Sequence, residues 1–373
     1  MFLKKICFWI LAMAIISTMV LSACAQSAAP TPTTAPKAAT QAATPKPAAT
    51  SAQEKPAAEK PAAAAKSAPL QKVKVVYTSI SVVQTVPWLA KETGLFEKYG
   101  LDVDLSLVQS TPPAVAALMS GEAQMLVGAQ EAVITSVLAG SDLEFIIGGP
   151  PRVLFSVFGD KSINSVKDLK GKKVGVTKHG TSTEFATKFA LRDAGLDPEK
   201  DVALMQVGTM PDILTALSTG AIQGATLSPP TSIRAKAQGF KMLYDVSSAN
   251  FPFHNGGIIV RKSWIPGHED IIRNFAKAYV EAAAQVKKDK ATTMKVIQKY
   301  TKVSDPNQLA ETYDDLVRIT PEKPYVVEEA LKTTLNDMKD QPKAQNADPK
   351  EFFDNRFIDE LDKSGFIDKV FKK

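Results

Sequence analysis

The segment VQSTPPAVAALMSGEAQ (residues 108–124) has a counterpart in VGTMPDILTALSTGAIQ (residues 207–223), 99 residues further along the chain. The two segments align without a gap. The same offset pairs Lys74 with Lys173, Thr78 with Thr177 and Gly140 with Gly239. A helix, a glycine and a strand in succession are common enough for one match to arise by chance. A constant offset over four successive strands indicates instead that the chain contains an internal duplication.

Short β-branched runs alternate with amphipathic segments that end at glycine, a pattern typical of parallel βαβ units. In the first copy we expect strands at 73–78, 101–108, 123–128 and 143–149, with helices at 86–100, 112–121 and 131–140. A second set starts with KVGVT at 173–177. The sequence therefore predicts an α/β protein with two similar, doubly wound lobes.

Two such lobes leave a crevice between them, and open parallel sheets bind ligands beyond the carboxyl ends of their strands. The duplication therefore predicts the binding loops in pairs. The pairs follow the first, second and third strand of each lobe: 79–81 with 178–182, 109–111 with 208–210, and 129–131 with 228–230.

The stretch VGVTKHGTSTEF (174–185) is a short strand that runs into the start of a helix. Thr181 and Glu184 match the S/T-x-x-E capping box, which would satisfy one or two of the free helix amides. The remaining amides, the neighbouring hydroxyls and the positive end of the helix dipole suit an anion or a carbonyl oxygen. Capping alone is the alternative interpretation.

Candidate ligand contacts are the polar residues at these loops and at the points where the chain passes between lobes. His179 is able to donate to an anion or to stack on a ring, and Arg152 is able to neutralise an acidic ligand. For each of them, ordinary turn, surface or hinge chemistry is the alternative. Trp88 is either a pocket wall or core. The candidates are Ser79, Ser81, Gln130, Arg152, His179, Gly180, Thr181, Ser182, Ser228 and Asn255.

The first 23 residues predict a secretory signal, because Lys4 and Lys5 precede an apolar run that is short for a membrane span. The run ends in LSAC (21–24), which resembles the lipobox of bacterial lipoproteins and predicts a lipid on Cys24. Residues 25–69 contain no Val, Ile, Leu, Met or aromatic residue. Residues 24–69 are therefore expected to be the lipidated cysteine followed by a disordered Ala/Pro-rich tether.

Charge and cysteine content exclude several classes of function. The net charge of +6 includes Lys4 and Lys5 and an excess of three lysines in the tether, so residues 70–373 carry about +1 and nucleic acid is not an expected partner. The only other cysteine, Cys7, lies in the signal. Disulfides, thiolate metal sites and cysteine nucleophiles are therefore excluded from the domain. We expect no metal and no cofactor.

Four segments resemble type II periplasmic binding proteins, in the branch of ABC-transporter substrate-binding proteins that includes the nitrate, aliphatic-sulfonate, taurine and thiamine-pyrimidine binders. They are AKETGLFEKYGLDVDL (90–105), ALMSGEAQMLVG (117–128), SVKDLKGKKVGVTKHGTSTEF (165–185) and GGIIVRKSW (256–264). The resemblance implies two hinge crossings, near 148–152 and 247–255. Lobe one would comprise 70–149 and 255–373, including a helical C-terminal tail, and lobe two 150–254.

The resemblance also implies the function. We expect an extracytoplasmic, lipid-anchored monomer that closes its lobes over a small organic or inorganic anion or a polar heteroaromatic ligand and docks on a membrane permease. The alternative is a sensor that delivers its closed form to a membrane signalling receptor. Enzymes of pyrimidine synthesis that share the fold use a cysteine-rich segment that this domain lacks, so we do not expect an enzyme.

Overall fold

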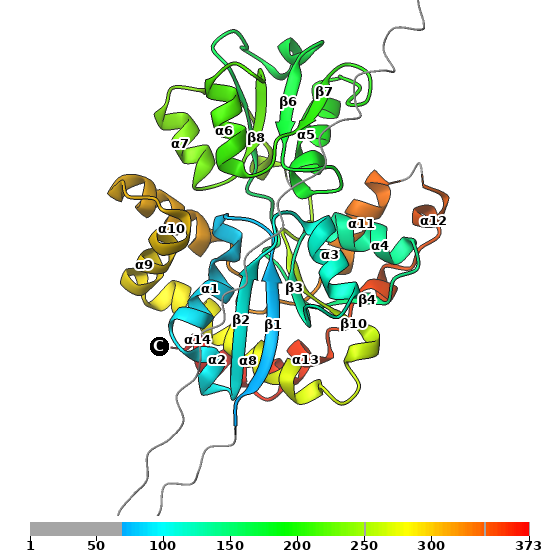
Figure 1. Ribbon diagram of the computed structural model, residues 1–373, viewed down its shortest axis with the longest axis vertical. Coiled ribbons are helices and arrows are strands. Elements are labelled where there is room, and N and C mark those ends of the chain that lie inside the picture. The colour runs from blue at the N-terminus through cyan, green and yellow to red at the C-terminus, as the bar shows by residue number, and fades with distance from the viewer. Residues whose placement is uncertain (1–68, 250, 339–340, 373) are drawn as a thin grey trace, which may run out of the picture. The chain divides into compact units, whose positions relative to one another are not determined.

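A computed structural model describes residues 69–249, 251–338 and 341–372 of the chain (Figure 1). The predicted signal peptide (1–23), Cys24 and all but the last residue of the predicted tether lie outside the described residues. Within the described ranges, no helix has the length and apolar character needed to span a membrane.

The first of two five-stranded sheets has the strand order β2-β1-β3-β10-β4. β1 pairs in parallel with β2 and β3, and β10 pairs antiparallel with β3 and β4. The strands are β1 (Gln71–Tyr77), β2 (Leu101–Leu107), β3 (Met125–Val127), β4 (Leu143–Gly148) and β10 (Gly257–Arg261).

The second sheet repeats this arrangement in the order β7-β6-β8-β5-β9, with β5 as the antiparallel strand. The first sheet therefore takes β10 from beyond the second crossing, whereas all five strands of the second sheet, β5 to β9, lie between the two crossings. This confirms the predicted two-lobed α/β class. The strands are β5 (Ser156–Gly159), β6 (Lys173–Val176), β7 (Ala203–Gln206), β8 (Gly224–Leu227) and β9 (Lys241–Asp245).

The duplication is visible in single hydrogen bonds. Helices α3 (Thr111–Met119) and α6 (Met210–Ser218) begin and end 99 residues apart. Gln124 accepts from the Lys74 amide at 2.9 Å and donates to the Gly121 carbonyl at 3.3 Å. Gln223 makes the same bonds, to Lys173 at 3.3 Å and to Gly220 at 3.0 Å. The repeated glutamine thus ties the first strand of each lobe to the turn before the third.

The two crossings run beside each other. The Asn255 amide donates to the Pro150 carbonyl at 2.8 Å, and a Cβ on Gly149 would lie 2.1 Å from the Gly256 carbonyl oxygen. Only glycine permits this close backbone approach at position 149. The two segments that join the sheets are 149–155 and 246–256, and they overlap the predicted crossings at 148–152 and 247–255.

Helices cover both sheets. One prediction was wrong: the segment 86–100 forms two helices, because Gly94 adopts a left-handed φ of 71° between them. The helices that start near the crevice are α1 (Thr85–Glu92), α4 (Gln130–Leu138), α5 (Ser182–Asp193) and α7 (Thr231–Ala237), with α2 (Leu95–Lys98) following α1. Short 3₁₀ turns are η1 (Val82–Gln84), η2 (Val166–Leu169), η3 (Val246–Ser248), η4 (Lys262–Trp264) and η5 (Pro349–Phe352).

The C-terminal helices complete the core of the first lobe. Helix α8 buries Phe275, which stacks on Phe96 at 5.0 Å between ring centroids, whereas Ile271 of the same helix is only partly buried. Trp88 is fully buried and stacks on Tyr300 at 4.5 Å, so it belongs to the core. The tail comprises α8 (Glu269–Lys288), α9 (Lys290–Thr301), α10 (Pro306–Ile319), α11 (Glu328–Asp337), α12 (Pro342–Gln345), α13 (Arg356–Lys363) and α14 (Phe366–Phe371).

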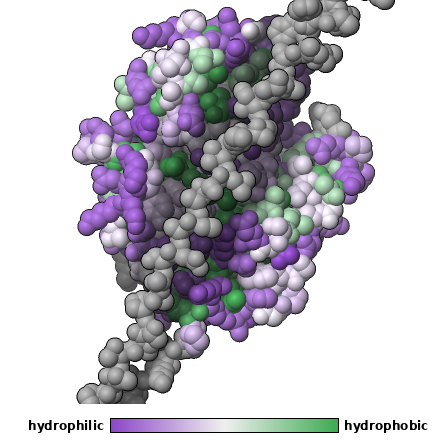
Figure 2. Space-filling view, viewed as in Figure 1, coloured by the Kyte–Doolittle hydropathy of each residue, from purple (hydrophilic) through white to green (hydrophobic). Residues whose placement is uncertain are grey.

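Hydrophilic residues predominate around the periphery of the face shown in Figure 2. The large hydrophobic side chains exposed among the described residues lie on several separate elements: Leu70, Met119, Met205, Met242 and Val327. The expected monomeric state remains a prediction.

We predict that Gln124→Ala and Gln223→Ala each lower the free energy of unfolding by about 1–2 kcal/mol, because each leaves a strand amide without its acceptor. Urea unfolding measures the change. The control is Glu122→Ala. This variant removes only the ion pair between Glu122 and Lys74, in which the Glu122 side chain is 66% exposed, so it should lower the free energy of unfolding by less than about 1 kcal/mol. Glutamine variants as stable as this control would contradict the role of the two glutamines as hydrogen-bond acceptors for the strand amides.

Candidate functional site

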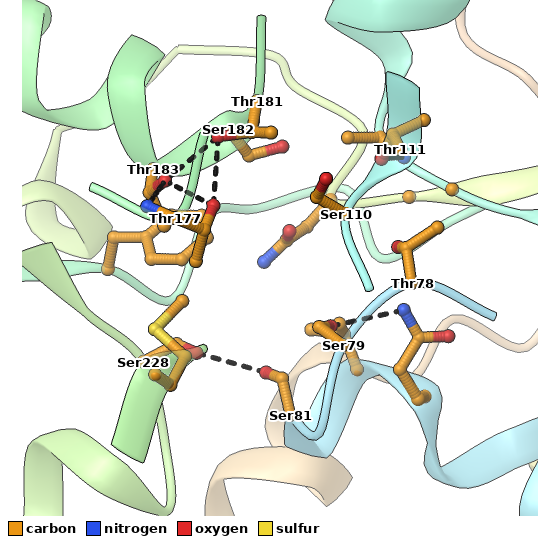
Figure 3. Close-up of a pocket in the computed structure, with 18 residues that line it drawn as sticks. Thr78, Ser79, Ser81, Ser110, Thr111, Thr177, Thr181, Ser182, Thr183 and Ser228 are labelled. Carbon is orange, nitrogen blue, oxygen red and sulfur yellow. Dashed lines mark hydrogen bonds between the residues drawn. The ribbon is translucent and has the colours of Figure 1, made fainter. Parts of the chain in front are cut away.

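A cavity lies at the carboxyl ends of the strands of both sheets (Figure 3). The cavity volume is about 60 Å³. None of its eighteen lining residues carries a charge. Ten of them bear a hydroxyl group: Thr78, Ser79, Ser81, Ser110, Thr111, Thr177, Thr181, Ser182, Thr183 and Ser228.

All six loops predicted from the duplication reach this cavity. The first lobe contributes residues after β1, β2 and β3, and the second lobe contributes residues after β6, β7 and β8. Asn255 and Gly256 at the second crossing also line it. The cavity is therefore built from equivalent positions of the two copies.

Several helix starts meet at the cavity. Ser110 precedes α3, Ala129 precedes α4 and Thr181 precedes α5, and each of these residues lines the cavity. At none of the three does a side chain cap the helix. The first amides of a helix have no partner inside it, and they carry partial positive charge. The free amides at these helix starts, which are fewest at α3 because Pro112 and Pro113 have no N–H, therefore add partial positive charge at the cavity.

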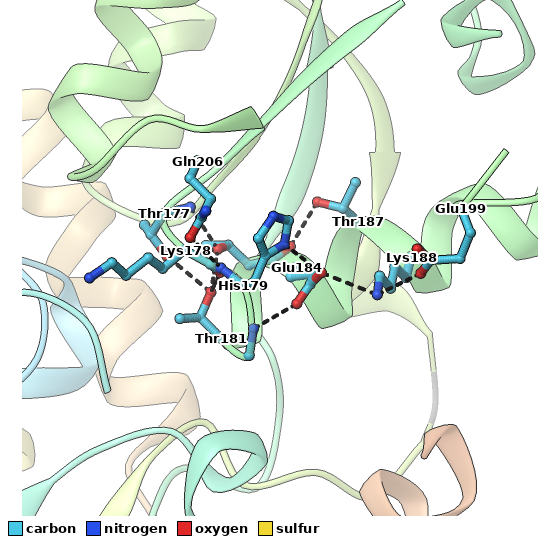
Figure 4. A network of polar contacts seen from close by, with 11 residues as sticks. Thr177, Lys178, His179, Thr181, Glu184, Thr187, Lys188, Glu199 and Gln206 are labelled. Carbon is cyan, nitrogen blue, oxygen red and sulfur yellow. Dashed lines mark hydrogen bonds and ion pairs between the residues drawn. The ribbon is translucent and has the colours of Figure 1, made fainter. Parts of the chain in front are cut away.

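The start of α5 differs from the predicted capping box. Thr181 Oγ1 donates to the Lys178 carbonyl at 2.6 Å and lies within 3.0 Å of the hydroxyls of Thr177 and Thr183. Glu184 instead accepts from the Gly180 amide at 2.7 Å and pairs with His179 Nδ1 at 2.9 Å (Figure 4). The capping-box prediction was therefore wrong, because Glu184 reaches past the cap residue to the loop.

The Glu184 carboxylate remains the ionised partner of this loop. Burial raises the pKa of Glu184, but the hydrogen bonds from Gly180 and His179 and the charge of Lys188 outweigh it and hold the pKa below its ordinary value. Lys188 also pairs with Glu199 at 2.7 Å. These bonds fix the loop that carries Thr181, and Ser182 and Thr183 at the start of α5 line the cavity.

Hydrogen bonds join the two lobes around the cavity. The hydroxyls of Ser81 and Ser228 share a bond of 3.0 Å, and the Val82 amide donates to the Pro229 carbonyl at 3.2 Å. Ser182 Oγ donates to Glu131 Oε2 at 3.0 Å. The lobes are therefore in direct contact on both sides of the cavity.

Three polar atoms at the cavity are buried without a partner among the described residues: Gln84 Oε1, Ser110 Oγ and Asn255 Nδ2. Buried polar groups normally find partners, so such orphans indicate where a ligand binds. Ser110 has φ 68° and ψ 153°, a backbone conformation that is costly for a residue with a side chain. Strain and an unused hydroxyl coincide at this residue.

Six predicted site residues line the cavity: Ser79, Ser81, Thr181, Ser182, Ser228 and Asn255. Four do not. Gln130 is fully buried and donates to the Ala330 carbonyl and to Thr334, because the first residue of α4 turns toward α11. His179 and Gly180 are held by Glu184 instead, and Arg152 is exposed at the first crossing.

His254 packs at the hinge, beside the predicted site residue Asn255. Its Nδ1 donates to the Gly149 carbonyl at 3.2 Å and its Nε2 accepts from the Val327 amide at 2.7 Å. Burial lowers the pKa of His254, so the ring is neutral between the two crossings and the tail.

Sequence reasoning missed Thr78, Ser110, Thr177 and Thr183 as cavity residues. A signal for two of them was present, since Thr78 and Thr177 are an identical pair in the duplication and each directly follows the first strand of its copy. Nothing in the sequence signals the unusual backbone of Ser110.

The architecture and the cavity define the class: a two-lobed binding protein of the periplasmic type. A family model described as NMT1/THI5 like matches residues 84–292, more than half of the chain, and the chain belongs to this family.

Individual similarities are more distant. The chain is 27% identical over 291 residues to a putative aliphatic sulfonates-binding protein of Bacillus subtilis (strain 168), covering 72% of this chain and 82% of that protein. It is 27% identical over 199 residues to a putative ABC transporter periplasmic binding protein of Brachyspira hyodysenteriae, covering 52% of this chain and 54% of that protein. A solved structure from Bordetella bronchiseptica RB50 matches with a TM-score of 0.71 and 21% identity, over 79% of this chain and 97% of that one.

We predict that Ser110→Gly raises the free energy of unfolding by about 1 kcal/mol, because glycine adopts the observed backbone conformation without strain. Ser110→Ala is the matched control, since it removes the hydroxyl but keeps the strain. Urea unfolding distinguishes the two variants. A glycine variant less stable than the alanine variant would contradict the strained geometry.

Proposed function

We propose that this protein is the substrate-binding component of an ABC import system and that it captures a small organic anion, without catalysis, in the cavity between its lobes. The observation that carries the proposal is the uncharged, hydroxyl-lined cavity onto which three uncapped helix starts open. Relatives named as a transporter binding protein and as a sulfonate-binding protein support the same class.

The chemistry of the cavity favours an anion over a cation. None of the residues that line it supplies a carboxylate, whereas amides and hydroxyls supply many donors. The unpartnered Asn255 Nδ2 and Ser110 hydroxyl add donors for an oxyanion. A buried arginine or lysine would attract the anion more strongly, but the ion pair would carry a larger desolvation penalty.

The cavity also favours an organic anion over a bare inorganic one. Val83, Phe155 and Met210 give it an apolar wall, which an alkyl chain would cover. The unpartnered Gln84 Oε1 is an acceptor that suits a donor group on the ligand. A short aliphatic sulfonate, with or without an amino or hydroxyl group, satisfies these features together.

The test is isothermal titration calorimetry of the purified chain with ethanesulfonate, nitrate, acetate and ethylammonium. We expect binding of ethanesulfonate, and we expect Thr183→Ala to weaken it at least tenfold, because the variant disrupts the hydroxyl cluster at the start of α5. The control is Thr215→Ala, on the exposed side of α6, which should leave the affinity unchanged. Binding of ethylammonium alone would contradict the proposal.

Lipid anchoring through Cys24 is part of the proposal and places the binding domain outside the cytoplasmic membrane. It is supported by the LSAC sequence at the end of the apolar run and by the Ala/Pro-rich segment that follows. A tether of this composition would hold the domain away from the membrane surface while it docks on a permease.

We expect Cys24→Ala to release the protein from the membrane fraction and to abolish incorporation of radiolabelled palmitate. Cys7→Ala, in the predicted signal, is the matched control and should change neither. Palmitate incorporation that survives in Cys24→Ala would contradict the assignment of the anchor.

A further inference from the structure

Glu131 is a buried carboxyl group next to the cavity, only 4% exposed and the one charged residue of α4. Its Oε2 accepts from Ser182 Oγ at 3.0 Å. Its Oε1 is buried without a partner among the described residues. Glu131 belongs to the first lobe, whereas Ser182 belongs to the second and lines the cavity. The hydrogen bond therefore exists only when the lobes are together.

None of the described cations pairs with Glu131. From α5 it faces Glu184, and from α11 it faces Asp337. The basic residues of α5 have other partners: Lys188 pairs with Glu184 and Glu199, and Arg192 pairs with Asp337. The other charged groups on the elements packed against α4 lie on α5, α11 and β4, and α3 has none. They are Asp193 on α5, Glu328, Glu329 and Lys332 on α11, and Glu144 on β4. Lys332 is paired with Glu328.

Burial is the main cause that raises the pKa of Glu131, to about 8, and the charges of Asp337 and Glu184 raise it further. The backbone at the start of α4 and the Ser182 hydroxyl lower it, but by less. Parting the lobes would remove Ser182 and Glu184 from this group and admit water, so its pKa would return toward the ordinary value of 4.5. Closure at neutral pH would then be coupled to protonation of Glu131.

We propose that Glu131 is a positioning residue whose proton sets the direction of the Ser182 hydroxyl, so that the lobes close on an anion together with one proton taken from solvent. This inference rests on the proposed anion-binding function and adds that anion binding is coupled to the uptake of one proton.

The direction in which the Ser182 hydroxyl points follows from the hydrogen-bonding capacity of Ser182 and Glu131. An ionised Glu131 can only accept hydrogen bonds, so the Ser182 hydroxyl donates its single proton to Glu131 and presents only lone pairs to the cavity. A protonated Glu131 donates to Ser182 Oγ, and the serine proton turns toward the cavity, where an anion accepts it. The proton comes from water or buffer and stays on the carboxyl group, and no bond of the ligand changes.

The test is calorimetric titration of the wild-type chain with ethanesulfonate, which does not itself titrate near neutral pH. Titrations at pH 7 in phosphate and in Tris buffer give the number of protons taken up. We expect close to one proton, and a Kd that rises about tenfold per pH unit between pH 5.5 and 7.5 and levels off above pH 8.

Glu131→Gln keeps a neutral side chain of the same shape, so it should take up no proton and should hold a Kd that is constant with pH. The matched control is Glu144→Gln: burial also raises the pKa of Glu144, but this carboxyl lies within the first lobe and its surroundings do not change on closure. The control should keep the wild-type pH slope.

Tight binding without proton uptake in the wild type, or a wild-type slope in Glu131→Gln, would overturn the proton coupling and leave the anion-binding function intact. Failure of the wild type to bind ethanesulfonate or the other anions at any pH would overturn both. The wild-type proton count needs no variant, so the test stands even if Glu131→Gln does not fold.

Discussion

The site depends on one constraint: the first amides of a helix cannot be satisfied within that helix. Among the α-helices of the described residues, α6, α9 and α10 meet the constraint with the side chain of the residue before the helix, as α6 does with Thr209. At α3, α4 and α5 the residue before the helix makes no such bond, and all three starts line the same cavity. The free amides are fewest at α3, where Pro112 and Pro113 have no N–H, and at α4 the Glu131 carboxyl group accepts from its own amide. Leaving these amides free costs stability in the empty protein. In the proposed function a bound oxyanion would recover that cost, which would give a neutral cavity a preference for negative charge.

The duplication explains why the helix starts converge. Each copy places its loops at the carboxyl ends of its parallel strands, and the two antiparallel strands β5 and β10 join the copies by two adjacent crossings. The crossings are packed closely at Gly149 and Gly256 and are held by His254. Two rigid lobes joined at such a short, double connection are suited to hinge motion. The contacts that cross the cavity, Ser81 with Ser228 and Ser182 with Glu131, are those that opening would break.

The sequence was sufficient for the fold and for the loops, because both follow from periodicity and from the constant offset between the copies. It was less reliable for single side chains. Gln130 and Ser182 both follow a strand and begin a helix, yet one turns into the first lobe and the other lines the cavity. That choice is made by the neighbouring element, α11 or the opposite lobe, which local sequence does not describe. Glu184 failed as a cap for a similar reason, since the geometry of the Lys178–Gly180 turn offered it a nearer amide.

The central claim is that backbone amides and hydroxyls, rather than charged side chains, hold the ligand. Its most direct test is a crystal structure of the protein with ethanesulfonate. The account predicts sulfonate oxygens within hydrogen-bond distance of the Thr111 amide, of the amides at the start of α5 and of Asn255 Nδ2. A sulfonate held by lysine, arginine or histidine side chains, with the cavity left to water, would contradict it.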